Sequence, residues 1–503
     1  MQVDPRAPCI VGVGSHTWHP GGSGATGAPE PLVMWEQVTR AAEADAGASL
    51  LGRLDDLEIV YCQTWQYDDP TRRLAERLGV SPRRRHYSGI GGTTPQVLLQ
   101  EAAARIARGE LDVALVVGAE ALDTQRRSKK AGDRYPYPGR YSHPPADRPA
   151  FPWEAPFHPA EVAHELFQAW LTFALFDNAR RGRLGIGLDE YRAQLGAQWQ
   201  RFTRVAATNP EAWFPFERSA AEIVTPTAEN RMVGYPYTKF MISIMDVDMA
   251  AAVFLTSHEC AESLGIPADR RVYVRGWQYA TDPVYVAEHP EMWRSPAMEV
   301  AAGTALRTAD VEIAGVAHLD LYSCFGSSVN FMRDALGIAP DDVRPLTVTG
   351  GLPYHGGAGS DYLTHAIAQM TRVLRDDPGA YGLVTGVGMH MTKHVAGVYS
   401  TVAPTGPAVA LIPEPAPAPA TVGIVTEPLV HDTTVDATVV AATVVHGREG
   451  PEWGIAVCDV PGGRTYARIE AADLLTDLEV SEWTGRRVAL GAHPTRDRVN
   501  LLT

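Results

Sequence analysis

The sequence predicts an α/β protein with a duplicated core and a separate small β domain in its C-terminal part. A glycine turn, a helical pattern and a buried strand follow one another from Gly91-Gly92 through residues 113–118. The same order recurs from Gly356-Gly357 through residues 381–386. Repetition of one supersecondary unit is the mark of an internally duplicated fold. A proline–alanine segment at 411–420 then separates a strand-rich remainder.

Composition limits the classes of protein that the chain can represent. Its 503 residues are 45% hydrophobic and 20% charged, as in a globular protein of two to four domains. The net charge of −15 argues against a nucleic-acid partner, whose phosphates require a basic surface. No apolar run approaches the ~20 residues of a membrane span, and the first residues lack a signal peptide's pattern, so we expect no membrane partner and a cytoplasmic location. Five scattered cysteines, without metal-binding spacing, suit a reducing compartment.

The first half, residues 1–258, begins with strands that alternate with helices. Glycine-terminated residues 7–14 and residues 57–62 read as strands, and residues 32–46 and 71–78 read as helices. In the first repeated unit Leu99, Ala103, Ile106 and Ala107 share one helical face, and 113–118 is apolar throughout. This run is typical of a strand that is covered on both faces of a sheet.

An insertion at 123–245 interrupts the first half. It is rich in arginine, proline, tryptophan and tyrosine and is too long for a plain connection. We predict an inserted loop subdomain with helices at 160–179 and 188–206. Its aromatic residues either line a pocket or hold an irregular subdomain together.

The second half, residues 259–410, repeats the alternation of strand and helix. We predict strands at 271–276, 319–325 and 395–402 and helices at 297–306 and 328–336, beside the second repeated unit. Linker 411–420 should be extended. In 421–503 the patterns at 437–445, 453–458, 464–469 and 487–490 predict strands of a five-stranded OB-like barrel. Without a basic patch or aromatic stripe, this domain is not predicted to bind oligonucleotides.

Several motifs resemble those of the thiolase superfamily over residues 7–410. QEAAARIARGELDVALVVGAEAL is similar to the segment that follows the family's nucleophilic cysteine, which places Gly92 at the nucleophile position. Residues 322–325, YSCF, resemble the second-half motif of an Asn or His, an acidic residue and Phe. Residues 350–359 resemble the glycine-rich motif that contains a catalytic histidine, here His355, and Gly386 falls near the family's last catalytic cysteine.

This resemblance implies a layered α/β/α/β/α core of the sterol-carrier-protein-thiolase type, here with an additional C-terminal domain. Such proteins are often named acetyl-CoA acetyltransferases. The resemblance implies acyltransferase chemistry in lipid metabolism, a coenzyme A thioester as ligand with no tightly bound cofactor, and a homodimer formed through the sheet. Thiolase-like steroid side-chain aldolases also lack the nucleophilic cysteine and resemble this chain in using tyrosines. They act with a partner that contains an OB domain.

The residues present modify the expected chemistry. Thiolase acyl transfer requires a thiolate, yet glycine occupies position 92 and also position 386. We predict Tyr322, His355 and His390 as catalytic acid–base groups. Tyr322 is alternatively a core aromatic, the histidines alternatively make structural hydrogen bonds, and Cys324 is either a relocated nucleophile or a packing residue. No metal site is predicted, because His390 and His394 would lie ~13 Å apart on a strand.

Five glycines are predicted to approach the ligand: Gly91, Gly92, Gly356, Gly357 and Gly386. Packing of tight turns explains the same residues equally well.

Three functions follow from these patterns. The chain is an acyl-CoA-handling acyltransferase with altered chemistry, a retro-aldol carbon–carbon lyase that acts on a β-hydroxyacyl-CoA through Tyr322, or a non-catalytic protein that binds a coenzyme A ligand.

Overall fold

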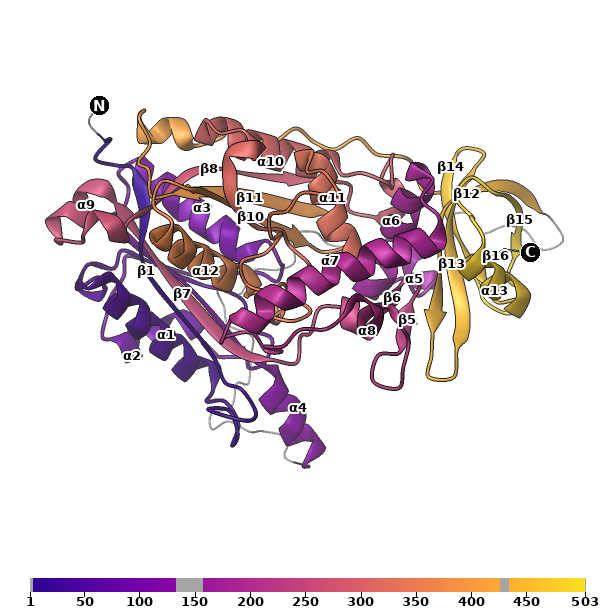
Figure 1. Cartoon of the computed structure of the whole chain (residues 1–503), viewed down its shortest axis with the longest axis horizontal. Coiled ribbons are helices and arrows are strands. Elements are labelled where there is room, and N and C mark those ends of the chain that lie inside the picture. Colours follow the sequence, from indigo (N-terminus) through magenta and orange to yellow (C-terminus); the bar gives the residue numbers. More distant parts are fainter. Residues whose placement is uncertain (1–2, 133–156, 426–433, 503) are drawn as a thin grey trace.

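A computed structural model of the protein describes residues 3–132, 157–425 and 434–502 (Figure 1). The described core strands form a nine-stranded mixed sheet in the order β3-β2-β4-β7-β1-β8-β11-β10-β9. The first half supplies strands β1 Pro8–Thr17, β2 Asp56–Ile59, β3 Arg84–Tyr87, β4 Val113–Ala121 and β7 Asp248–Ser257, and helices α1 Pro31–Ala46, α2 Pro70–Leu78, α3 Thr94–Ala107 and α9 His258–Ser263.

The second half contributes the other side of this sheet. Its elements are β8 Val272–Thr281, α10 Pro296–Ala309, β9 Val316–Asp320, α11 Gly326–Leu336, α12 Tyr362–Asp376, β10 Tyr381–Gly388 and β11 Lys393–Ser400. The two halves meet where β1 pairs with β8 at Cys9 and Tyr273. The predicted alternation of strand and helix in both halves is therefore confirmed, with element ends shifted by a few residues.

Helices form three layers around the two halves of the sheet. Helix α1 packs on β1 and β7, and α10 packs on β8 and β11. Helices α3 and α12, which come from the two repeated units, touch each other and lie between the two sheet halves (Figure 1). This arrangement is the predicted layered α/β/α/β/α core. It buries both faces of the central strands, and all nine residues of β4 are buried.

The insertion consists mainly of helices that cover one end of the core. Its described elements are α4 Leu122–Lys130, α5 Pro159–Ala163, α6 Ala169–Leu184, α7 Leu188–Thr208, α8 Ala220–Val224, β5 Met232–Gly234 and β6 Tyr237–Thr238. The predicted helix over 160–179 is wrong. The chain leaves the helical path at His164–Gln168, where Glu165 adopts a left-handed φ of 61°, and a new helix begins at Ala169.

The C-terminal region is a closed five-stranded β-barrel, as the strand pattern predicted. Strands β12 Val435–His446, β13 Pro451–Val460, β14 Gly463–Ile469, β15 Arg487–Ala492 and β16 Asn500–Leu502 pair in a ring that closes between β12 and β13. Helix α13, Ala472–Val480, connects β14 to β15. Neither α13 nor β16 was predicted. The assignment of this barrel to the OB type stays a prediction.

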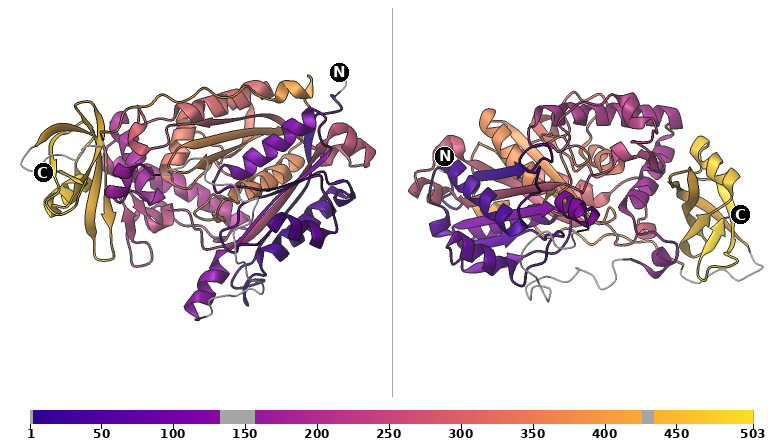
Figure 2. Two further views of the ribbon diagram at one scale, coloured as in Figure 1. Left: turned by 180° about the vertical axis from the view of Figure 1, so that it is seen from behind. Right: turned by 90° about the horizontal axis from the view of Figure 1, so that it is seen from below.

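The barrel is joined to the insertion by continuous pairing and buried hydrogen bonds. Val445 of β12 pairs with Gly234 of β5, so the barrel sheet extends into the insertion. The buried carboxylate of Glu161 on α5 accepts a hydrogen bond from Tyr466 Oη at 2.8 Å and another from the backbone N–H of Val286 at 2.8 Å. Figure 2 shows the barrel beside the helices of the insertion from two further directions. No helix in the described part of the chain has the length and apolar character of a membrane span.

Candidate functional site

Gly92 and Tyr322 meet at the N-terminus of α3. A Cβ atom added to Gly92 would lie closer than 3.0 Å to the Tyr322 hydroxyl oxygen and to the carbonyl oxygen of Val387. Side-chain carbon atoms do not tolerate such separations. The volume in which a side chain at position 92 would start is therefore filled by a phenol and by the backbone of β10.

Two strands of the second half hold Tyr322 in this position. Tyr322 lies two residues beyond the end of β9, and its backbone N–H donates to Thr385 Oγ1 of β10 at 3.0 Å. The side chain is 5% exposed, and its hydroxyl makes no hydrogen bond with any described residue. Burial raises the pKa of Tyr322 well above its usual value, so the phenol stays protonated at neutral pH. A protonated hydroxyl without a partner is free to donate a hydrogen bond to a substrate oxygen.

A buried carboxylate network supports the ring of Tyr322. The ring lies edge-on to that of Tyr362, with centroids 5.6 Å apart. Tyr362 Oη donates to Asp320 Oδ1 at 2.8 Å, and Thr347 Oγ1 donates to Asp320 Oδ2 at 2.9 Å. Burial raises the pKa of Asp320, although these hydrogen bonds act in the opposite direction. The network fixes Tyr362, which in turn limits the positions that the Tyr322 ring can take.

His355 packs against the rings of Tyr362 and His365. Its ring is 6.1 Å from that of Tyr362 and 5.4 Å from that of His365, and its Nδ1 is 3.3 Å from Asn209 Nδ2. Burial lowers the pKa of His355 well below its usual value, so the imidazole is neutral at pH 7. Its Nε2 is buried without a hydrogen-bond partner among the described residues. Tyr362 thus contacts both His355 and Tyr322.

His390 lies in the turn between β10 and β11, and Lys393 is the first residue of β11. Gly388 is paired with Lys393 across the two strands, and a Cβ atom on Gly388 would lie 3.3 Å from Thr93 Oγ1 and 3.5 Å from Lys393 Cδ. The stem of Lys393 and the hydroxyl of Thr93, the residue before α3, therefore both lie next to Gly388. Burial lowers the pKa of Lys393 to about 8 and that of His390 to about 4. Lys393 was not predicted as a site residue, although it is one of only four lysines in the sequence.

The reactivity of Lys393 can be tested by amine labelling. We expect the rate of Lys393 acetylation by dilute acetic anhydride to rise with pH and to level off above about pH 8, because the amine is then mostly uncharged. Peptide mapping resolves the four lysines. An N-acetyl-lysine amide standard should continue to gain reactivity towards pH 10, near the ordinary lysine pKa of about 10.4. A Lys393 profile that follows the standard would contradict the depressed pKa.

The five glycines predicted to bind a ligand have different surroundings. Gly91 donates its N–H to Ser360 Oγ at 3.0 Å, and the space beside Gly386 is occupied by Leu363 and Val395. The space beside Gly356 contains Met249, and that beside Gly357 contains Ser243. Protein atoms pack against all of these positions, and Gly92 alone faces Tyr322. Ligand binding by the glycines stays a prediction.

The described cysteines are packing residues rather than thiolates. All five are buried. Cys324 Sγ is 3.6 Å from Ser328 Oγ, and burial raises the Cys324 pKa to about 12. A thiol with this pKa is a poor nucleophile at neutral pH. The geometry therefore disfavours Cys324 as a relocated nucleophile.

Among the residues that the structure describes, no group of three or more His, Cys, Asp or Glu side chains is arranged to hold a metal ion.

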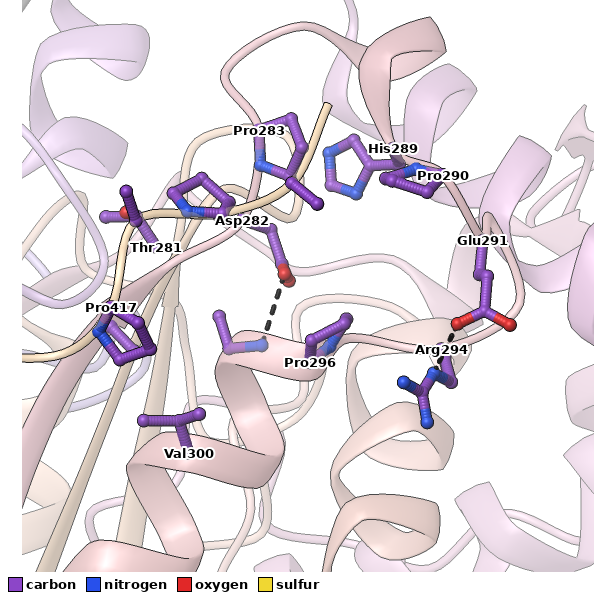
Figure 3. A pocket seen from close by; sticks show the side chains of 15 residues that line it. Thr281, Asp282, Pro283, His289, Pro290, Glu291, Arg294, Pro296, Val300 and Pro417 are labelled. Carbon is purple, nitrogen blue, oxygen red and sulfur yellow. Dashed lines mark hydrogen bonds and ion pairs between the residues drawn. The ribbon is translucent and has the colours of Figure 1, made fainter. Parts of the chain in front are cut away.

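A cavity of about 250 Å³ lies where β8 ends and α10 begins (Figure 3). It is bounded by the N-terminus of α10, residues 280–291 and the proline–alanine segment at Pro417. Asp282 in its wall accepts a hydrogen bond from the backbone N–H of Ala297 at 3.1 Å and pairs with His394 Nε2 at 3.0 Å. His394 Nε2 is also 3.0 Å from the carbonyl oxygen of Met391. Asp282 and His394 thereby fix the turn between β10 and β11 against the core.

Comparison with known proteins identifies the fold. No protein-family model and no curated protein sequence matches the chain. A solved SCP2-thiolase-like protein type 1 from Mycobacterium smegmatis, described as monomeric, matches with a TM-score of 0.80 and 29% identity over 100% of both chains. The Ltp2–ChsH2(DUF35) aldolase matches with a TM-score of 0.60 and 17% identity over 78% of this chain and 98% of that one. An acetyl-CoA acetyltransferase from Syntrophomonas wolfei matches with a TM-score of 0.57 and 16% identity over 80% of this chain and 100% of that one.

These matches establish that the chain has a thiolase-like fold. More particularly, the chain is similar over its full length, including the barrel region, to an SCP2-thiolase-like protein. The two matches below 20% identity support the fold alone.

Proposed function

We propose that the protein handles acyl-CoA thioesters and cleaves a carbon–carbon bond in a β-hydroxyacyl-CoA by a retro-aldol reaction. This proposal rests on one observation. The hydroxyl of Tyr322 occupies the space in which a nucleophilic side chain at position 92 would begin. A thiolase-like site in which a phenol replaces the thiol is suited to stabilising an oxyanion rather than to forming an acyl-enzyme.

The reaction needs one base and one oxyanion stabiliser. The base takes the proton of the β-hydroxyl group, the β-oxygen becomes a carbonyl, and the bond between the α- and β-carbons breaks. Its electron pair forms the thioester enolate. A proton then adds to the α-carbon, so a β-hydroxyacyl-CoA gives an aldehyde or ketone and a shortened acyl-CoA. Tyr322 donates a hydrogen bond to the enolate oxygen, where charge develops during bond cleavage.

Lys393 is the proposed base. With a pKa of about 8, roughly a tenth of the Lys393 side chains are uncharged at pH 7 and about half at pH 8, and general bases work best when their pKa is close to the working pH. His390, with a pKa lowered to about 4, is a weaker base and suits a hydrogen-bonding role. The N-terminus of α3, with its positive end directed to the site, adds favourable potential for a developing oxyanion.

The test is a comparison of products and adducts. The full-length protein is incubated with a panel of β-hydroxyacyl-CoA thioesters of increasing chain length, and liquid chromatography with mass spectrometry follows release of acetyl-CoA and of the carbonyl product. We expect equimolar release of both products without a covalent adduct on the intact protein. A stable acyl adduct formed from acetyl-CoA would instead support the acyltransferase alternative. Binding of CoA thioesters without any turnover would support a non-catalytic binding protein.

A further inference from the structure

A second cavity, of about 310 Å³, is lined by residues of α6, α7 and α11. Figure 1 shows these three helices. The cavity shares no lining residue with the surroundings of Gly92 and Tyr322 described above. Two aromatic residues of the insertion, Tyr191 and Phe202, line it. The remaining apolar wall is formed by Leu184, Ile186, Leu195, Ile338 and Leu346.

Two arginines at this cavity have no carboxylate partner among the described residues. Arg180 is neutralised, because its Nε and Nη2 donate to the two carboxylate oxygens of Asp334 at 2.6 and 2.9 Å. Arg201 instead donates to the carbonyl oxygens of Asp342 and Arg344, at 2.8 and 2.6 Å. Arg333 donates to the carbonyl oxygen of Ala339 at 2.9 Å. The cavity wall therefore has excess positive charge in a protein whose net charge is −15.

Two buried donors in the same wall also lack an acceptor among the described residues. They are Arg333 Nε and Gln198 Nε2. The two side chains are neighbours, with Arg333 Nη1 3.5 Å from Gln198 Oε1, and Gln198 is only 8% exposed. Burial and the nearby charges of Arg180 and Arg201 lower the pKa of Arg333. Buried donors without acceptors are uncommon in folded proteins, so this wall is polar as well as positively charged.

We propose that this cavity binds a small monocarboxylate with an apolar chain. Its carboxylate is recognised by Arg333 and Arg201, with Gln198 beside them, and its chain lies against the aliphatic and aromatic wall. The size suits a chain of about eight carbons, near the lower limit of typical ligand pockets. This proposal is independent of the retro-aldol reaction, since it uses none of the same residues.

Isothermal titration calorimetry of the full-length protein with octanoate tests this site. We expect submillimolar binding with one site per chain, and at least tenfold weaker binding of octanamide, which has the same chain without the charge. Arg333→Gln should weaken octanoate binding about tenfold, whereas Arg192→Gln, on the exposed face of α7, should not change it. Equal binding of octanamide and octanoate, or unchanged binding by Arg333→Gln, would overturn the proposal.

A steric variant separates loss of the site from loss of folding. Ala197 lines the cavity on the exposed side of α7, and Ala193 lies one turn earlier, exposed and outside the cavity. Ala197→Trp should abolish octanoate binding, while Ala193→Trp should leave it intact, with both variants retaining the parent unfolding midpoint. Displacement of octanoate by inorganic phosphate only at high phosphate concentration would support a carboxylate site. Tight phosphate binding with no octanoate binding would overturn the choice of ligand.

Discussion

Replacing Tyr322 by phenylalanine is expected to lower kcat for β-hydroxyacyl-CoA cleavage by about 10²–10³-fold while leaving KM nearly unchanged. The variant keeps the ring that packs on Tyr362 and removes only the hydroxyl that faces Gly92. Loss of one preorganised donor to an oxyanion typically costs this much in kcat. Initial rates of acetyl-CoA release, measured with purified wild-type and variant protein, provide the comparison.

Tyr354 provides a matched control. It is also a buried tyrosine, and its hydroxyl is buried without a hydrogen-bond partner among the described residues, but it does not contact the Gly92 position. Tyr354→Phe should therefore retain close to full activity. Equal turnover by Tyr322→Phe and the wild-type protein would remove Tyr322 from the mechanism, whatever the control shows.

Placing a cysteine at position 92 should fail to produce thiolase chemistry. In Gly92→Cys the new Cβ would meet both Tyr322 Oη and the backbone oxygen of Val387, and a backbone atom cannot move aside as a side chain can. We expect no acyl adduct from acetyl-CoA in intact-protein mass spectrometry. We also expect the free energy of unfolding to fall by about 1–3 kcal/mol, the usual cost of overpacking a core.

Alanine variants separate the steric effect from the chemistry of the thiol. Gly92→Ala should show the same loss of stability in urea unfolding. Gly21→Ala, at a glycine with nothing within 4 Å of the added Cβ atom, should show almost none. In a Tyr322→Ala background, Gly92→Ala should cost less than it does in the wild-type protein but should still be destabilising, because the Val387 oxygen remains. An acyl adduct on the thiol introduced by Gly92→Cys would show that the site reshapes to accept a nucleophile.

The strands and helices of the core could be predicted because the sequence patterns that specify them are local. Apolar runs such as 113–118 and helical faces such as that of Leu99, Ala103 and Ile106 occur in elements that are buried as the patterns require. The helix break after α5 had no local signal, since residues 164–168 contain neither glycine nor proline. Its cause is tertiary: His164 Nε2 accepts a hydrogen bond from the backbone N–H of Asn500 in the barrel. Strand β16, only three residues long, also depends on the barrel around it.

The site was only partly predictable. Family motifs pointed to Gly92 and Tyr322, but their contact depends on how α3, β9 and β10 come together, which periodicity does not reveal. His355 has the residue type of a proton carrier, and it contacts the Tyr362 ring that also packs on Tyr322. Lys393 was missed because a lysine at the start of a strand resembles an ordinary surface residue. The scarcity of lysine in the chain was the one sequence signal that could have drawn attention to it.

The homodimer implied by the family resemblance stays a prediction. The free edge of the sheet in the first half is β3, where Arg84, Arg85 and His86 follow one another. Charged side chains on a short edge strand discourage pairing between copies. Sedimentation velocity at low and high salt decides the matter: a dimer through this edge should strengthen at high salt, where repulsion between the arginines is screened.

The hydrogen bond between Glu161 and Tyr466 has a consequence for biosynthesis. Its two partners are 305 positions apart, so a ribosome must complete most of the chain before the α5 carboxylate meets its tyrosine donor. Until then, the second half of the core is still being synthesised and the insertion lacks its contacts with the barrel. At the usual 5–20 residues per second, this interval lasts roughly 15–60 seconds. The insertion therefore reaches its final hydrogen bonding only after the barrel has been synthesised.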